Sequence, residues 1–336
     1  MALLEVKNLT TSFKTAQGKV QAVRDVSFSL DEGEVLGIVG ESGSGKSQTM
    51  YTIMGLLASN GIVENGEIIF NGEHIEPSAF KNRKEYEKKM RSLRGSEIAM
   101  IFQDPMTFLN PTLRIETQLI EPLMNHTKMS KKEARERALE LMRFVGIPSP
   151  EKRIKQYPFE FSGGMRQRIV IAIALTCNPK VIIADEPTTA LDVTIQAQVL
   201  ELIDNLRKET NAAIVMITHD LGVIAKLCDK VGIMYGGKLV ETGTDKEIFY
   251  EPKHPYTKGL LNCIANPEDD DNERELQPIP GSPPDLLNPP KGCPFVDRCG
   301  KAMKVCKLYM PEEKTFTDSH MSKCWLNDER GAKYND

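Results

Sequence analysis

Four runs of consecutive apolar residues divide the chain at wide intervals. They lie at residues 35–40, 98–102, 181–185 and 213–218. Each run is short and has no polar face, which is typical of strands buried on both sides of a parallel sheet. Parallel strands are joined by helical crossovers, so the pattern predicts an α/β core in which these strands alternate with helices.

Two other stretches alternate between apolar and polar residues. Residues 3–30 do so, as in Leu4-Glu5-Val6-Lys7, and residues 66–75 contain Asn71-Gly72. Asn-Gly is typical of the type I′ turn of a β-hairpin. Together these stretches predict an antiparallel β-subdomain beside the core.

The segment between Gln103 and Ser162 has helical periodicity, and a helical subdomain is predicted at about residues 104–160. Ser130 followed by Glu133 predicts a capping box at the start of its clearest helix. The apolar residues that follow share one helical face: Ala134, Ala138, Met142 and Val145.

The chemistry begins where the first apolar run ends. Residues 40–47 have the sequence GESGSGKS, which satisfies the P-loop pattern G-x-x-x-x-G-K-[ST] between a strand and a helix. Gly43 and Gly45 allow backbone N–H groups to surround an anion. Lys46 is predicted to reach the β- and γ-phosphates of a nucleotide, and Ser47 to hold Mg²⁺.

Two adjacent acids end the third apolar run. Asp185 is placed to hold Mg²⁺, and Glu186 is placed to polarise an attacking water molecule. Pro187 then ends the strand. Adjacent acids are often only part of a solvated loop, but the P-loop upstream favours the catalytic interpretation.

A second Gly-rich helix start lies before these acids. Ser162, Gly163 and Gly164 open an apolar helix, a further N-terminus suited to phosphate. With this segment the chain resembles the nucleotide-binding subunits of ABC (ATP-binding cassette) transporters, whose signature is usually LSGGQ. Phe161 and Met165 replace the Leu and Gln of that signature.

The resemblance implies roles for further residues. Gln103 corresponds to the Q-loop glutamine near Mg²⁺ and the attacking water, and His219 to the switch histidine that contacts the γ-phosphate. Residues 189–192 resemble the D-loop, and Phe13 would stack on adenine. The full set implied to contact ATP or its Mg²⁺ comprises Phe13, Gly40, Ser42, Gly43, Ser44, Gly45, Lys46, Ser47, Gln48, Gln103, Ser162, Gly163, Gly164, Asp185 and His219.

The family also implies an assembly. Two cassettes would bind head to tail with two ATP molecules between them. The second cassette would be a paralogue of this chain. The helical subdomain would contact two transmembrane permease subunits at the cytoplasmic face of the membrane. An extracellular substrate-binding protein would act indirectly.

The chain continues beyond the cassette, which is expected to end near residue 250. The extension, residues 251–336, holds three motifs: His254-Pro255-Tyr256-Thr257, Ile279-Pro280-Gly281-Ser282-Pro283-Pro284 and Gly292-Cys293-Pro294-Phe295. They resemble the D-type ATP-binding subunit of oligopeptide and dipeptide importers, a resemblance that covers essentially the whole chain. Peptide is the implied cargo, although relatives of that family also move nickel, glutathione or oligosaccharides.

Four of the seven cysteines lie in this extension: Cys293, Cys299, Cys306 and Cys324. Their spacing lacks the Cys-x₂-Cys pair typical of a zinc ribbon, and disulfides are disfavoured in a reducing cytosol. A [4Fe–4S] cluster needs four thiolates and tolerates varied spacing. The predicted ligand is this cluster, with zinc as the second choice and unligated thiols as the third. His320 is expected to be solvent exposed rather than a substitute ligand, and Cys263 to be buried.

Composition narrows the class of protein further. A chain of 336 residues with 40% apolar residues can form a sizeable core. Its net charge of −4 gives no basic excess that would favour nucleic acid, and the basic stretch at residues 81–94 contains glutamates typical of a solvated helix face. We find neither a signal-peptide pattern nor a long apolar span, so a peripheral protein is expected. The alternative class is a soluble ABC ATPase that acts on nucleic acid or the ribosome.

Overall fold

The computed structural model describes residues 2–189, 192–263 and 278–333. It divides into two compact units. The first comprises Met1–Leu3, Leu30–Val35 and Pro77–Ile217, and the second comprises Leu4–Ser29, Leu36–Glu76 and Thr218–Asp336. Each unit is described by itself below.

The first unit contains three parallel strands, β6 (Ile98–Ile101), β7 (Val181–Asp185) and β8 (Ala213–Thr218). β7 lies in the middle, with Val181 opposite Ile98 on one side and Ala213 on the other. Every residue of the three strands is buried. The unbroken apolar runs of the sequence therefore predicted these strands correctly.

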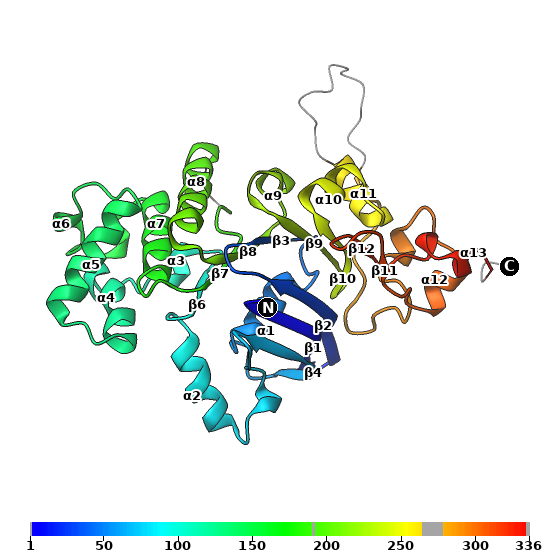
Figure 1. Ribbon diagram of the computed structural model, residues 1–336, viewed down its shortest axis with the longest axis horizontal. Helices are drawn as coiled ribbons and strands as arrows, with labels where there is room; N and C mark the ends of the chain where they lie inside the picture. Colours follow the sequence, from blue (N-terminus) through cyan, green and yellow to red (C-terminus); the bar gives the residue numbers. More distant parts are fainter. Residues whose placement is uncertain (1, 190–191, 264–277, 334–336) are drawn as a thin grey trace, which may run out of the picture. The chain divides into compact units, whose positions relative to one another are not determined.

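The helices of the first unit include the predicted helical subdomain, in which α4, α5 and α6 lie together (Figure 1). The capping box is confirmed: the Glu133 N–H donates to Ser130 Oγ at 3.3 Å, and the Ser130 N–H donates to Glu133 Oε2 at 2.7 Å. Ala134, Ala138 and Met142 are fully buried, as their spacing predicted. The helical elements are η1 (Pro77–Ala79), α2 (Arg83–Leu93), α3 (Pro105–Phe108), α4 (Ile115–His126), α5 (Lys131–Phe144), α6 (Pro150–Arg153), η2 (Pro158–Glu160), α7 (Gly163–Ala174) and α8 (Val193–Thr210).

The second unit contains the predicted antiparallel sheet, drawn in blue shades in Figure 1. Its strands lie in the order β2 (Gly18–Leu30), β1 (Leu4–Thr15), β4 (Gly61–Phe70), β5 (Glu73–His74). Asn71 and Gly72 have φ values of +50° and +78°, the left-handed pair that a type I′ turn requires. The predicted hairpin is confirmed.

A further set of strands in this unit includes several that sequence analysis did not predict. β3 (Val35–Val39) pairs in parallel with β9 (Lys230–Tyr235), and β9 pairs antiparallel with β10 (Lys238–Thr244). The extension adds β12 (Met321–Ser322) and β11 (Lys314–Thr315) beyond β10. The helical elements of the unit are α1 (Lys46–Ile53), α9 (Leu221–Leu227), α10 (Asp245–Tyr250), α11 (Pro255–Asn262), η3 (Val296–Arg298), α12 (Lys304–Leu308), η4 (Trp325–Asn327) and α13 (Glu329–Lys333).

The extension thus belongs to the same unit as β3 and α1, and the predicted division of the chain at residue 250 stays a prediction. Its Pro-rich segment has no helix or strand, as expected. This segment contacts β2 through two hydrogen bonds: the Gln21 N–H donates to the Leu286 carbonyl at 2.8 Å, and Arg24 Nη2 donates to the Pro290 carbonyl at 2.9 Å.

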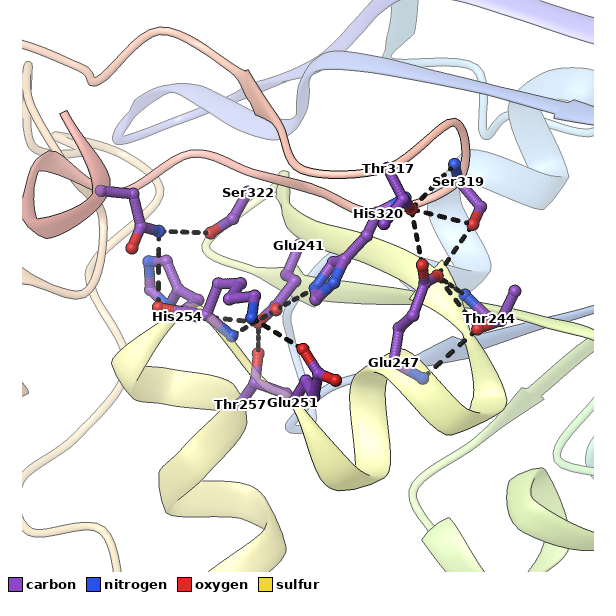
Figure 2. A network of polar contacts seen from close by, with 12 residues as sticks. Glu241, Thr244, Glu247, Glu251, His254, Thr257, Thr317, Ser319, His320 and Ser322 are labelled. Carbon is purple, nitrogen blue, oxygen red and sulfur yellow. Dashed lines mark hydrogen bonds and ion pairs between the residues drawn. The ribbon is translucent and has the colours of Figure 1, made fainter.

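A buried carboxylate holds the extension against β10 (Figure 2). Glu241 is 1% exposed, and its Oε1 lies 2.6 Å from the Lys253 N–H nitrogen and 2.8 Å from His320 Nε2. Its Oε2 accepts from the His254 N–H at 2.9 Å and from Thr257 Oγ1 at 2.5 Å. These four partners offset the cost of burying the carboxylate, because a buried carboxylate without hydrogen bonds is strongly destabilising.

The expectation that His320 is exposed was therefore wrong. Its side chain is 1% exposed and is bonded to Glu241, which lies 79 residues earlier. Nearby, Glu247 accepts from Thr317 Oγ1 at 2.5 Å and from Ser319 Oγ at 2.8 Å. These hydrogen bonds outweigh the opposing effect of burial and lower the pKa of Glu247 to about 2.

His254 predicts a measurable dependence of stability on pH. Its Nδ1 accepts from the Tyr256 N–H at 3.1 Å, and burial lowers its pKa from 6.5 to about 3. Between these values the unfolded chain binds a proton that the folded chain does not bind. This residue therefore contributes stability above pH 6.5, and the contribution is lost as pH falls toward 3.

We expect the pH slope of the unfolding free energy in the acid range to decrease by about 1.4 kcal/mol per pH unit in His254→Asn. Asn keeps a side-chain acceptor for the helix start but does not titrate in this range. Denaturant unfolding at a series of pH values measures the slope. His126→Asn, at an exposed histidine, is the control and should keep the natural slope; equal slopes in the two variants would contradict the prediction.

Candidate nucleotide-binding and catalytic site

The P-loop connects β3 with α1 in the second unit. Gly43 and Gly45 have φ values of +76° and +103°, which favour glycine. Gly40 and Gly45 are also required by close neighbours, because a Cβ there would lie 2.1 Å from the Met234 carbonyl oxygen and 2.3 Å from the Ala22 carbonyl oxygen. α1 begins directly afterwards at Lys46, so the positive end of this helix faces the loop.

Polar groups of this loop suit an anion. Lys46 is 6% exposed, and its Nζ donates to the carbonyls of Gly40 at 2.7 Å and Glu41 at 3.1 Å. Ser44 Oγ is buried and has no hydrogen-bond partner within the described parts of the chain. Ser42 and Gly43 are exposed, whereas Ser47 and Gln48 are half-buried in the first turn of α1. The arrangement fits phosphate, because a buried hydroxyl and an ammonium group are stabilised by further polar partners.

Two other predicted residues belong to the same unit. Phe13 lies on β1 and is half-buried; its ring lies 2.9 Å from the position that a Cβ of Gly61 would take. His219 follows β8 and is exposed. It directly precedes Asp220, whose Oδ1 accepts from the Gly222 N–H at 2.8 Å and caps α9.

The first unit holds the acidic pair. Asp185 ends β7 and is 1% exposed. Glu186 follows with a φ of +47°, a conformation that costs an L-residue about 1–2 kcal/mol. Such strain is found where a side chain must take an exact direction.

The same unit brings Gln103 and Glu186 together. Gln103 Nε2 donates to Glu186 Oε2 at 2.8 Å, although the two residues are 83 positions apart. Thr189 Oγ1 donates to the same oxygen at 2.9 Å. Sequence analysis gave Thr189 only as part of the resemblance to the D-loop and did not foresee this contact. The two central residues of that loop, 190 and 191, lie outside the described residues.

The signature segment also has the expected local structure. α7 begins at Gly163, and Ser162 Oγ accepts from the Met165 N–H at 3.4 Å. A Cβ at Gly164 would lie 2.8 Å from Ile195 Cγ2, so this position excludes larger residues. Ser162 and Gly163 are exposed and offer the free first turn of an apolar helix.

The four cysteines of the extension share one neighbourhood. Cys293, Cys306 and Cys324 are buried and Cys299 is half-buried; all four are free thiols. Burial raises the pKa of Cys293 to about 12, and a charge on any of the other three would raise it further. The Cys293 N–H donates to the Cys306 carbonyl at 2.9 Å. Cys263, in contrast, is exposed, so the expectation that it is buried was wrong.

In the described residues, no group of three or more His, Cys, Asp or Glu side chains has the arrangement of a metal site. The geometry therefore gives no support of its own for iron–sulfur or zinc, and either ligand stays a prediction. Across the same residues, no helix is long and apolar enough to cross a membrane.

Three features together define the class of protein. They are a Gly-rich Lys-Ser loop after a strand, an Asp-Glu pair after another strand and a helix that begins with Ser-Gly-Gly. They are the elements of an ATP-binding cassette on an α/β fold. Comparison with known proteins agrees. The sequence matches the ABC transporter family over residues 23–189, and the oligopeptide/dipeptide transporter C-terminal region over residues 240–306.

Several curated relatives are similar over nearly their whole length. The dipeptide transport ATP-binding protein DppD of Bacillus subtilis is 54% identical over 98% of this chain and 96% of its own length. The oligopeptide transport ATP-binding protein OppD is 55% identical in Bacillus subtilis, over 96% of this chain and 88% of its own length. OppD of Salmonella typhimurium is 52% identical over 96% of this chain and 93% of its own length.

Solved structures of cassettes are similar as well. The dimeric cassette MJ0796, in a post-hydrolysis state bound to ADP and Pi, is 27% identical with a TM-score of 0.62, over 72% of this chain and 98% of that one. The cassette cbiO1 from Clostridium perfringens has a TM-score of 0.61 and is 28% identical, over 74% of this chain and 91% of that one. The chain belongs to the ABC transporter family, among the ATP-binding proteins of oligopeptide and dipeptide transport.

Proposed function

We propose that this chain hydrolyses ATP to drive the uptake of dipeptides or oligopeptides through membrane permease subunits. The relatives that match almost the whole chain are ATP-binding proteins of dipeptide and oligopeptide transport. The observation that carries the enzymatic part is the Gln103–Glu186 hydrogen bond. It holds a carboxylate at the end of a buried strand, directly after Asp185.

The phosphate-binding, Mg²⁺-binding and catalytic residues have distinct roles in this proposal. The P-loop, with Lys46, binds the β- and γ-phosphates; Ser47, Gln103 and Asp185 hold Mg²⁺, which supplies charge neutralisation when bound. Glu186 accepts the proton of the attacking water, and Gln103 and Thr189 fix the direction of its carboxylate. Ser162, Gly163 and Gly164 bind the nucleotide of a second cassette, which is why the isolated chain should be a weak ATPase.

The proposed assembly follows the same logic. Two cassettes, this chain and a paralogue, bind head to tail, and the helical subdomain contacts two permease subunits at the cytoplasmic face of the membrane. An external substrate-binding protein selects the cargo. The dimer recorded for a structural relative supports pairing of cassettes in general.

Glu186→Gln should bind Mg·ATP normally but lower ATP turnover by at least about 100-fold, because an amide cannot accept the proton from water. The transporter assembled with its permease is the sample, and phosphate release is the measurement. Glu209→Gln, at an exposed acid on α8 of the same unit, is the matched control and should hydrolyse normally. Natural turnover in Glu186→Gln would remove the residue from this role.

Reconstituted transporter should take up labelled peptide only with ATP, and Glu186→Gln should abolish that uptake. The physical reason is that cassette opening depends on hydrolysis of the bound nucleotide. Nickel, glutathione and an oligosaccharide are tested in parallel. Uptake of one of these compounds without uptake of peptide would contradict the proposed cargo but not the proposed ATPase activity. Copurification of the chain with nucleic acid in place of permease subunits would contradict the proposed role in transport.

We also propose that Cys293, Cys299, Cys306 and Cys324 hold a [4Fe–4S] cluster. Burial raises the pKa of Cys324 to about 11, and that of Cys293 to about 12, so these two thiols would stay protonated at neutral pH without a metal ligand. Iron binds the thiolate form and would offset the cost of burying that charge. The small irregular extension gains stability from such a centre.

Anaerobically purified protein should be brown and contain about four irons per chain. Cys324→Ser should lose the colour and the iron and unfold the extension at lower temperature. Cys263→Ser, at an exposed cysteine outside the four, should keep all three properties. Colourless protein with one zinc per chain would contradict the cluster and support a zinc site. Protein without any metal would contradict both metal sites.

A further inference from the structure

The extension reaches the nucleotide loop itself, at Glu41. The backbone N–H of Glu41 donates to Tyr256 Oη at 3.0 Å, and Arg298 Nη1 donates to Glu41 Oε2 at 2.6 Å. The carbonyl of the same residue accepts from Lys46 Nζ at 3.1 Å. One residue of the P-loop is thus fixed by two side chains of the extension and by the loop's own lysine.

Arg298 is held rigidly for this contact. Its Nε donates to the Pro280 carbonyl at 2.9 Å and its Nη2 to the Ile279 carbonyl at 3.0 Å. Its Nη1 also donates to Tyr235 Oη at 3.0 Å. Only 7% of the side chain is exposed. A guanidinium with its donors directed at fixed acceptors loses little further entropy when it binds a carboxylate.

The surrounding motifs are built around this arginine. Gly281 has a φ of +81°, and a Cβ there would lie 3.3 Å from Arg298 Cγ, so a side chain would crowd the arginine. Tyr256 is fully buried, with its ring centroid 4.4 Å from that of Tyr235 and 5.3 Å from that of Phe295. Residues of the three motifs that sequence analysis singled out in the extension therefore surround the two side chains that contact Glu41.

The charge of Glu41 makes the contact significant for a polyanion. A carboxylate in a phosphate-binding loop repels the ligand, and the repulsion is larger where the group is partly shielded from water. Glu41 is 26% exposed at its side chain. Arg298 neutralises this charge, while Tyr256 Oη accepts from the Glu41 N–H and fixes the orientation of that peptide group in the loop.

We propose that Arg298 and Tyr256 are positioning residues through which the extension sets the affinity of the P-loop for nucleotide. The inference rests on the proposed nucleotide site at the P-loop. Tyr256 and Arg298 lie more than 200 positions after Glu41 in the sequence, and yet both contact it. Distance along the chain is not distance in the fold.

The test is a titration of the full chain with a fluorescent ATP analogue in the presence of Mg²⁺. Arg298→Ala should raise the Kd about 10-fold, within the range typical of coupling between sites. Tyr256→Phe, which removes only the hydroxyl, should raise it about 3-fold. Arg298→Lys should recover part of the lost affinity, because it restores the charge without the fork.

Two controls separate positioning from general damage. Arg330→Ala removes another arginine of the extension, one that pairs with Asp328 and Glu312, and should leave the Kd unchanged. In a Glu41→Gln background, Arg298→Ala should change the Kd less than about 2-fold, because the charge that Arg298 neutralises is gone. A merely structural role would lower the unfolding temperature of the nucleotide-free chain and act equally in both backgrounds.

Lys46→Ala distinguishes the two ways in which the idea can fail. If Lys46→Ala loses binding while Arg298→Ala, Arg298→Lys and Tyr256→Phe all bind like the natural chain, this inference alone is overturned. If Lys46→Ala binds normally, the proposed nucleotide site is wrong and the inference is overturned with it. Should Arg298→Ala not fold, Arg298→Lys and Tyr256→Phe decide the question.

Discussion

Backbone contact at the P-loop is the constraint on which the second unit depends. Gly40 and Gly45 leave no room for a Cβ because carbonyl oxygens of Met234 and Ala22 approach them directly. The loop is therefore packed against the end of β9 and against β2. This packing fixes the direction of the loop's N–H groups before any ligand arrives, and preorganised donors bind anions without the cost of ordering them.

The extension is attached to the same strands that support the loop. Tyr235 ends β9 and contacts Tyr256, Phe295 and Arg298, and the turn after it packs against Pro294 and Pro284. Glu241, on the next strand, accepts four hydrogen bonds from residues of the extension. A buried carboxylate that loses a hydrogen-bond partner is strongly destabilising. Detaching the extension from β10 would therefore raise the free energy of the folded chain.

The sequence predicted most of what is local. The four buried strands, the capping box at Ser130 and the type I′ turn at Asn71 depend on residues a few positions apart, and each is confirmed. β9 and β10 were missed even though a signal was present: an apolar run, residues 231–235, followed by Gly236-Gly237, both of which have positive φ values. Tight glycine pairs between apolar runs are typical of hairpins.

Several contacts that sequence analysis did not predict depend on partners far along the chain. His320 was expected to be exposed because nothing near it in the sequence explains burial, and its partner Glu241 is recognisable only in the fold. The Gln103–Glu186 hydrogen bond and the Arg298–Glu41 ion pair have the same character. Motif spacing identifies the chemical groups of a site, whereas the side chains that direct them lie on other elements.

Glu41 illustrates why such partners matter to the site. The P-loop pattern leaves its second position open, so the pattern itself does not distinguish a carboxylate there from a neutral side chain. In this fold the carboxylate is matched by an arginine whose side chain is 7% exposed and which also donates hydrogen bonds to the extension and to β9. The charge of the loop is thus determined jointly with the extension, and an isolated cassette without it would present a different electrostatic field to the nucleotide.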